Sequence, residues 1–190
     1  MESEYMSILT SFFEKYKFEQ YLLGFLRIAY GFEFLWAFLD KLLGLGINTT
    51  PENSFLAGGS PTEGFLLYGT NPNSPFATIF NGPDAVLLEL GILVDLAYMG
   101  MLLVGGVTLI TGIGVRIGGF STAMFFFSVW LSSIPPEFNP ILEEHFLQMW
   151  ILIFFAISSS GYWLGLGERW HRFLETNLNE KLGRLTWILQ

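Results

Sequence analysis

Ionisable residues interrupt two apolar segments of this sequence, and they are its strongest indication of chemistry. The first segment carries Arg27, Glu33, Asp40 and Lys41, and the second carries Glu89 and Asp95. Inside a membrane, a charged side chain costs about 3 kcal/mol unless it is paired or faces a polar cavity. These six residues therefore indicate either a functional site or a network of structural ion pairs.

Three of these residues are predicted to lie near the middle of the membrane. The rise of a helix places Glu33 and Asp95 close to the midplane, with Arg27 about one to two turns nearer one end. The long Arg27 side chain could reach either carboxylate, which predicts a buried ion pair of Arg27 with Glu33 or Asp95. Such a pair would either serve a site or lock two helices together, and the sequence leaves both readings open.

A second polar group is predicted at the opposite end of the helices. Lys41, Glu89 and His145 should lie there at similar depth, and we expect them to be the catalytic residues. Lys41 or His145 could bind an oxyanion or donate to a quinone carbonyl, and a carboxylate could take a proton. The residues expected to bind the substrate or quinone are Arg27, Trp36, Asp40 and Gln148. For Glu143 and Glu144, a water-exposed polar rim is the favoured alternative.

Four apolar segments must position these side chains. They cover Tyr21–Leu45, Ala85–Ile110, Ile117–Ile134 and Phe146–Leu164. Each is close to the roughly 20 residues that cross a bilayer as a helix. The sequence therefore predicts an all-α fold, a four-helix bundle embedded in a membrane.

Lys and Arg residues are unevenly distributed around the four segments. They flank the chain start, the turn between the second and third segments, and the tail, at Lys15, Lys17, Arg116, Arg169, Arg172, Lys181 and Arg184. The connections Gly46–Asp84 and Pro135–His145 contain none. Because loops rich in Lys and Arg stay on the cytoplasmic side, both termini are predicted to be cytoplasmic in a multi-pass protein of the cell membrane.

Three stretches outside the segments have a predicted structure. The outer connection 46–84 carries two apolar stretches of its own, so we expect a folded cap rather than a slack loop. Residues 1–20 alternate charged and aromatic types, which fits a helix lying at the inner interface as well as it fits an unattached polar lead-in. The tail 165–190 is expected to be amphipathic and cytoplasmic.

The composition excludes several classes of protein. Of 190 residues, 52% are hydrophobic and only 14% are charged, which is too apolar for a soluble domain. The net charge of −8 argues against nucleic acid as a partner, because nucleic acid requires a basic face. The chain has no cysteine, and His145 and His171 should lie a membrane thickness apart, so we expect no iron–sulfur cluster, haem or metal site. Redox chemistry would then need a membrane quinone or a partner protein.

Four motifs resemble those of the DoxX/DoxD membrane proteins, and together they span most of residues 22–170. They are LRIAYGFEFLWAFLDKLLG at 26–44, PTEGFL at 61–66, NPILEEH at 139–145 and GYWLGLG at 161–167. The DoxD branch is the membrane subunit of a thiosulfate:quinone oxidoreductase, whose usual partner is a small DoxA subunit. The resemblance implies the same fold and a DoxA-like partner, and it places Arg27, Asp40, Lys41 and His145 at motif positions.

The leading hypothesis is a quinone-reactive membrane subunit of an oxidoreductase of the thiosulfate:quinone type. The alternative is a non-catalytic structural or accessory subunit of a larger membrane complex, in contact with lipid and other subunits. A third and weaker hypothesis is a small-solute carrier that uses the midplane charges. Neither an inverted repeat nor a broken helix in the sequence supports a carrier.

Overall fold

The computed structural model describes residues 2–137, 139, 141–177 and 186–189. Side chains are described from Lys17 onward, except at 187. Over these residues the structure contains helices and no strand. Three helical stretches are long and apolar enough to cross a membrane: Lys17–Leu43, Ile92–Thr111 and Val115–Ser133. The expected all-α class is therefore confirmed, and these three helices indicate a membrane protein.

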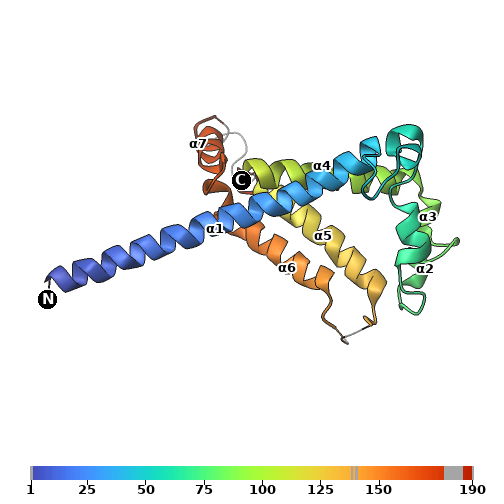
Figure 1. The fold of residues 1–190 in the computed structure, drawn as a ribbon, viewed down its shortest axis with the longest axis horizontal. Helices are drawn as coiled ribbons and strands as arrows, with labels where there is room; N and C mark the ends of the chain where they lie inside the picture. Colours follow the sequence, from blue (N-terminus) through green and yellow to red (C-terminus); the bar gives the residue numbers. More distant parts are fainter. Residues whose placement is uncertain (1, 138, 140, 178–185, 190) are drawn as a thin grey trace.

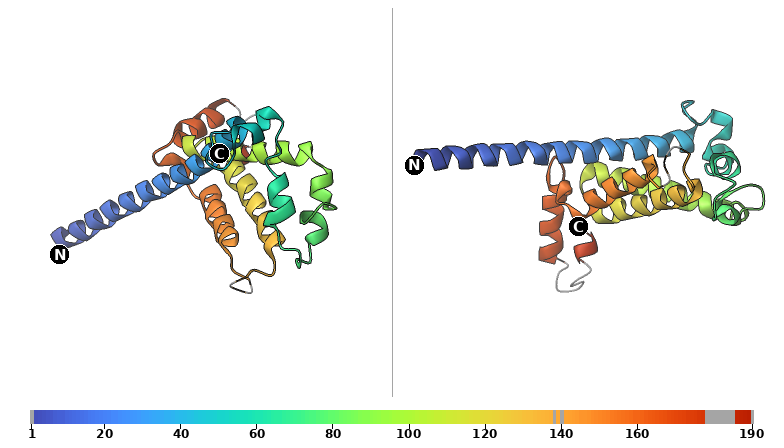
Figure 2. Two further views of the ribbon diagram at one scale, coloured as in Figure 1. Left: turned by 45° about the vertical axis from the view of Figure 1, so that its right-hand side comes forward. Right: turned by 90° about the horizontal axis from the view of Figure 1, so that it is seen from below.

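The first helix, α1, is continuous from Glu2 to Leu43 and extends far beyond the helices that pack against it (Figures 1 and 2). Its 42 residues correspond to about 63 Å. Residues 2–20 thus continue the first apolar segment as one helix instead of forming a separate interfacial one. The amphipathic character expected for 1–20 depends on the side chains of 1–16, which lie outside the described residues.

Three further helices pack in chain order: α4 (Ile92–Thr111) against α1, α5 (Val115–Ser133) against α4, and α6 (Glu144–Ile157) against α5. The turn between α4 and α5 contains Gly112 and Gly114, both with positive φ, so the two helices run antiparallel. α6 has 14 residues, about 21 Å, which is shorter than the roughly 30 Å hydrocarbon core of a bilayer.

Besides the earlier start of α1, two other predicted helix boundaries are wrong, and local chemistry explains both. The segment 85–110 is divided into α3 (Val86–Glu89) and α4, because Gly91 between them has φ +49. The segment 146–164 is helical only to Ile157 and continues as the short helix η4 (Ser160–Tyr162). The hydroxyls of Ser158 and Ser160 both donate to the Phe155 carbonyl, and such local bonds compete with helix continuation.

The connection between α1 and α4 folds over one end of the helices, which we call the cap end (Figure 1). It contains η1 (Pro51–Asn53), η2 (Phe55–Ala57), η3 (Phe65–Gly69) and α2 (Ala77–Phe80), followed by α3. The opposite end, the tail end, carries α7 (Gly167–Asn177) and α9 (Thr186–Leu189). The predicted amphipathic tail includes 178–185, which lie outside the described residues.

Glycine residues let the long helices approach closely. A Cβ added at Gly106 of α4 would lie 2.8 Å from the Leu35 backbone nitrogen of α1, and one at Gly119 of α5 would lie 2.8 Å from the Ala156 Cβ of α6. Because lipid supplies no hydrophobic force between helices, such close packing is a main source of cohesion in a membrane. Glycines of α4 and α5 therefore set the spacing between these helices and their neighbours α1 and α6.

Candidate functional site

A cavity of about 430 Å³, the central cavity, lies toward the cap end among α1, α4 and α5. The connection closes it on one side, and the first turn of α6 contributes one residue. Its lining residues are Glu33, Phe34, Ala37, Lys41, Pro61, Thr62, Phe65, Tyr98, Leu102, Phe125, Phe126, Val129 and His145. The volume falls within the usual range for small-molecule sites, roughly 300–1,000 Å³.

The charged groups of the central cavity come from two helices. Glu33 and Lys41 lie eight residues apart on α1, with Ala37 midway, so the helical repeat puts all three on one face. His145 enters from α6, so the structure brings Lys41 and His145 together, as their positions predict. The carboxylate that lines the same cavity is Glu33, an exposed residue of α1, and not Glu89. The four-residue steps from Glu33 to Ala37 and Lys41 could have predicted this result.

Neither Lys41 nor Glu33 forms a salt bridge with another described residue. Among the described residues, the salt bridges are those of His145 with Glu143, His171 with Glu175 and Arg172 with Glu168. No described carboxylate therefore lies within salt-bridge distance of the Lys41 ammonium, which lines a cavity with a largely apolar wall. A lysine so placed is suited to donating hydrogen bonds to an oxygen of a bound molecule.

Aromatic rings form much of the wall around these charges. The Phe34 and Phe126 ring centroids are 5.9 Å apart, and those of Tyr98 and Phe125 are 5.2 Å apart. The Phe126 ring also packs against the His145 imidazole, with centroids 5.6 Å apart and an angle of 31°. These rings offer flat apolar surfaces on which a planar ligand ring can stack. Sequence reasoning did not identify Tyr98 or Phe126 as lining residues.

A second cavity of about 270 Å³, the apolar cavity, adjoins the first between α4 and α5. The two share five lining residues, Thr62, Phe65, Tyr98, Phe125 and Val129. Its other lining residues include Met124, which is 67% exposed on α5. The apolar cavity therefore adjoins the central cavity and includes an exposed side chain on the side of the protein, where a membrane protein meets lipid.

Asp95 holds the cap in place over the central cavity. Its Oδ1 atom accepts hydrogen bonds from the Ser60 hydroxyl at 2.9 Å, the Thr62 hydroxyl at 2.7 Å and the Thr62 backbone N–H at 3.1 Å. Asp95 is buried in the first turn of α4. These donors satisfy the charge of one of the two carboxylates, Glu33 and Asp95, that the sequence suggested as partners of Arg27.

Arg27 is fully buried and bonds to backbone carbonyls at the tail end instead of to a carboxylate. Its Nε donates to Ser160 at 3.1 Å, Nη1 donates to Leu109 and, at 3.2 Å, to Ile110, and Nη2 donates to Trp163 at 3.1 Å and Leu164 at 3.4 Å. The expected ion pair of Arg27 with Glu33 or Asp95 is therefore not formed, and Arg27 does not reach the central cavity. It joins α1 to the last turn of α4 and to the chain after α6, where helix carbonyls lack intrahelical partners.

Four other predicted residues lie outside the central cavity. The Asp40 carboxylate is buried but accepts the backbone N–H groups of Ile47 and Asn48, at 3.3 and 3.0 Å, and so stabilises the turn after α1. Trp36 is 39% exposed and stacks on Phe32 along the surface of α1. Glu89 is exposed on α3, and Gln148 of α6 is not among the lining residues.

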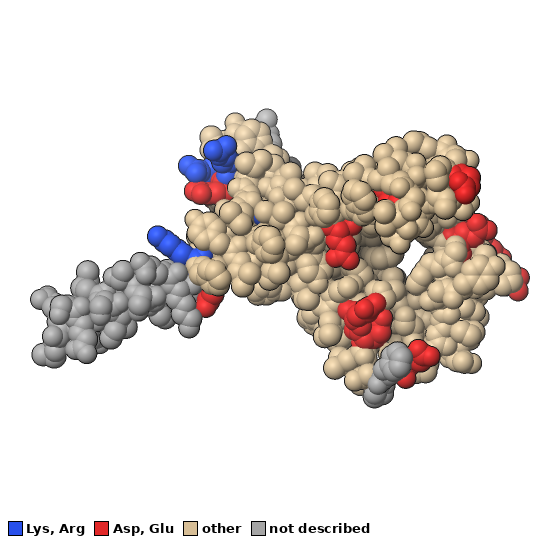
Figure 3. Space-filling model, viewed as in Figure 1, with Lys and Arg blue, Asp and Glu red and all other residues tan. Residues whose placement is uncertain are grey.

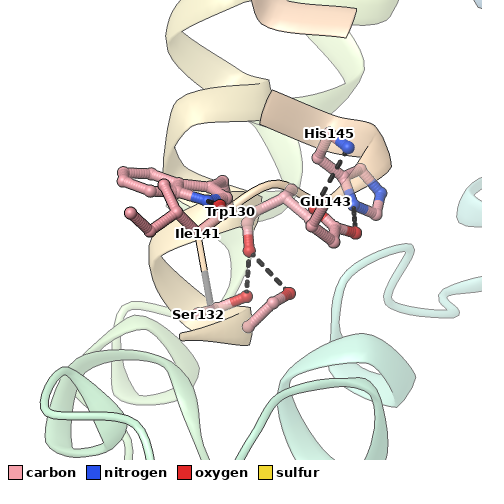
Figure 4. A network of polar contacts seen from close by, with 7 residues as sticks. Trp130, Ser132, Ile141, Glu143 and His145 are labelled. Atoms are coloured by element: carbon pink, nitrogen blue, oxygen red, sulfur yellow. Dashed lines mark hydrogen bonds and ion pairs between the residues drawn. The ribbon is translucent and has the colours of Figure 1, made fainter. Parts of the chain in front are cut away.

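A third space, the polar groove, lies beside the central cavity at the cap end. Its volume is about 920 Å³, and it is lined by residues from the connection, from the loop after α5 and from the start of α6, including Glu143. Glu143 also bonds to His145, as Figure 4 shows. Nearby, the Trp130 indole N–H donates to the Ile141 carbonyl at 2.9 Å and holds the loop.

The start of α6 also gathers possible metal ligands. Ligand atoms of Glu143, Glu144 and His145 lie within 4.8 Å of one another. Exposed acids often share such a spacing without metal, and here Glu143 is already engaged with His145. The arrangement is better described as a hydrogen-bonded His–carboxylate pair next to a second carboxylate.

Comparison with known proteins adds no assignment: no protein-family model, no curated protein and no solved structure matches the chain. The resemblance to DoxX/DoxD proteins therefore stays a prediction. What the arrangement can do follows from its own chemistry, which is a lysine, a carboxylate and an imidazole in an aromatic cavity with an apolar cavity beside it.

Proposed function

We propose that this chain is the quinone-binding membrane subunit of an oxidoreductase. The observation that carries the proposal is the pairing of two adjoining cavities. One holds Lys41, Glu33 and His145, and the other is apolar and reaches the exposed Met124. A quinone has the matching shape, because a flat polar head is joined to a long apolar tail.

The central cavity suits the head of such a molecule. A quinone carbonyl accepts hydrogen bonds, and the Lys41 ammonium and a His145 ring N–H can donate them. Aromatic side chains such as Phe126 and Tyr98 provide surfaces for the flat ring. The tail would pass through the apolar cavity between α4 and α5 toward the lipid, so the quinone would enter from the side.

Reduction of a quinone to a quinol requires two electrons and two protons. The resemblance to DoxD proteins implies thiosulfate as the donor and a DoxA-like subunit as the partner that delivers the electrons. This chain would bind the quinone, orient its oxygens and supply protons. Chemistry at the cap end would then explain why the connection folds over the cavity.

The distribution of charge supports an orientation with the cap end outside the cell. On the face drawn in Figure 3, the Lys and Arg atoms gather near α7 and α1, while most of the acidic atoms lie over the other half. By the positive-inside rule, the tail end would be cytoplasmic, with α1, α4, α5 and the shorter α6 forming a four-helix bundle. Cysteine labelling tests this orientation, because the chain has no cysteine. In intact cells, an impermeant maleimide should label Asn53→Cys but not Glu175→Cys.

One observation favours the alternative of an accessory subunit. The N-terminal part of α1 extends beyond the packed helices, as a segment that docks on another subunit would (Figure 2). An accessory role requires no ligand in the cavities. It predicts a protein that always purifies within a larger assembly and carries no quinone.

Purification in a mild detergent tests the proposal. Under the quinone proposal, the wild-type chain carries extractable quinone and loses most of it on Lys41→Met. The control is Lys17→Met, which removes the same charge at an exposed position of α1. Quinone-free wild-type protein that also binds no added short-tail quinone would reject the proposal, and co-purifying chains would then favour the accessory role.

A further inference from the structure

One pair of side chains connects the central cavity with the polar groove. His145 lines the central cavity, and Glu143 lines the polar groove. The Glu143 carboxylate accepts the backbone N–H of His145 at 3.0 Å through Oε2, and Oε1 bonds to the Nδ1 atom of the imidazole (Figure 4). The two spaces are therefore linked by one His–carboxylate hydrogen bond.

The start of α6 fixes this geometry. Glu143 is the residue before the helix, and its side chain caps the first turn, which directs the carboxylate back toward His145. The imidazole is held on its other side by the Phe126 ring of α5. Both side chains are about one-quarter exposed, 22% for Glu143 and 27% for His145, so the pair reaches water without being fully solvated.

The two spaces differ strongly in polarity. The groove is lined by polar side chains including Asn71, Asn73 and Glu137, and its volume is large enough for many water molecules. The wall of the central cavity is mostly apolar, and its other titratable groups are Glu33 and Lys41 from α1 and Tyr98 from α4. Water in the polar groove could therefore supply protons on the Glu143 side of the pair, whereas the central cavity on the His145 side has few groups that can donate a proton.

We propose that Glu143 and His145 carry protons from the polar groove to a quinone reduced in the central cavity. This inference rests on the proposed function and adds the proton route to it. In the loaded state, the imidazolium holds one proton on Nδ1, bonded to Glu143, and one on Nε2. The Nε2–H bond breaks as an O–H bond forms on the reduced quinone, which leaves a neutral ring.

Reloading uses the carboxylate. Glu143 takes a proton from the groove, the ring turns so that its bare Nε2 faces the carboxyl group, and Nε2 takes the proton. Nδ1–H then faces the cavity and delivers the second proton. One proton enters for each proton delivered, and two cycles complete a quinol. The other titratable groups around the ring are Glu144 on α6 and Glu33 and Lys41 on α1, while α5 packs the apolar Phe126 ring against it. With the cap end outside, quinone reduction would consume protons from the outer solution.

The test uses the full chain, purified in detergent, loaded with a short-tail benzoquinone and reduced by dithionite in a stopped-flow instrument. The ultraviolet absorbance reports quinol formation, and the reaction is followed over a pH series and in H2O and D2O. Glu143→Gln keeps an oxygen that can cap α6, but its amide cannot take up and release a proton as a carboxylate does. Glu144→Gln is the matched control, because it removes the same charge one residue away without a hydrogen bond to His145.

We expect Glu143→Gln to bind the quinone within about twofold of wild type but to form quinol on the order of 100-fold more slowly, with a changed pH profile. Glu144→Gln should behave as wild type, and His145→Gln, the second variant if Glu143→Gln does not fold, should be slowed as well. Quinol formation by Glu143→Gln at the wild-type rate and pH profile would overturn the proton route and leave quinone binding intact. A wild-type chain that binds no quinone would overturn both.

Discussion

The Asp95 carboxylate of α4 accepts two hydrogen bonds from Thr62 of the connection, one from its hydroxyl at 2.7 Å and one from its backbone N–H at 3.1 Å. Asp95 is only 4% exposed, and Thr62 lines both the central and the apolar cavity. One buried charge thus fixes the position of the cap relative to the helices. The cap is held by one of the two carboxylates that the sequence suggested as partners of Arg27.

Replacement of Asp95 by leucine should release the cap. Hydrogen bonds to a charged group contribute about 1.5–3 kcal/mol each, so Asp95→Leu should lower the midpoint of thermal unfolding and expose 46–84 to limited proteolysis. Asp95→Asn retains an oxygen acceptor and should show a smaller effect. Glu89→Leu, an exposed acid on α3, serves as the control. Equal protease resistance of Asp95→Leu and wild type would show that the cap is held by other contacts.

Removal of the Arg27 guanidinium should destabilise the tail end. Arg27→Met leaves the carbonyls of Leu109, Ser160 and Trp163 without their donor in a buried region, which should cost about 3 kcal/mol or more. Thermal unfolding in detergent measures the loss, with Lys17→Met as the exposed control, expected to change stability by less than about 0.5 kcal/mol.

The same variant distinguishes carbonyl bonding from the ion pair that the sequence suggested. A buried pair predicts that removing the carboxylate as well, in Arg27→Met with Asp95→Asn, restores much of the lost stability. The observed contacts predict that the two losses add, because Arg27 and Asp95 share no partner. A double variant more stable than Arg27→Met alone would contradict the carbonyl contacts.

Two glycines of α4 should respond oppositely to the same change. Gly106→Ala places a methyl group 2.8 Å from the Leu35 backbone nitrogen and should cost about 1–3 kcal/mol by forcing α1 away. A methyl group at Gly100 meets no described atom within 4 Å apart from the adjoining backbone of its own helix. Gly100→Ala should therefore be neutral or stabilising by up to about 1 kcal/mol, since alanine favours the helix. Unfolding midpoints of the two variants measured side by side provide the comparison. Similar values would mean that α1 and α4 are not closely packed at Gly106.

The positions of the long helices could be predicted from the sequence because apolar length and glycine turns are local signals. Predicted and observed limits of the third segment, 117–134 and Val115–Ser133, differ by at most two residues. The end of the fourth was missed because three serines in an apolar run look like a continued helix. The bonds from the Ser158 and Ser160 hydroxyls to the Phe155 carbonyl become visible only in three dimensions.

The partners of the charged residues could be predicted only in part. Lys41 and His145 meet because both lie near helix ends on the same side, which depth along a helix can predict. The predicted ion pair of Arg27 with Glu33 or Asp95 is wrong because the depth of a residue along its helix does not give the rotation of that helix. It also does not give the positions of backbone groups in loops. The carbonyls that Arg27 binds and the Thr62 donors of Asp95 come from non-helical chain or helix ends, whose positions leave no periodic signal.

Photolabelling with a quinone tests the central claim most directly. A short-tail quinone bearing an aryl azide is irradiated with the purified chain, and the labelled peptides are mapped by mass spectrometry. Our account predicts labels within 61–65, 98–102 and 124–129, competed by unmodified quinone, lost in Lys41→Met and retained in Lys17→Met. Labels confined to the exposed surface of α6, such as Trp150 and Phe154, and unaffected by competitor would contradict it.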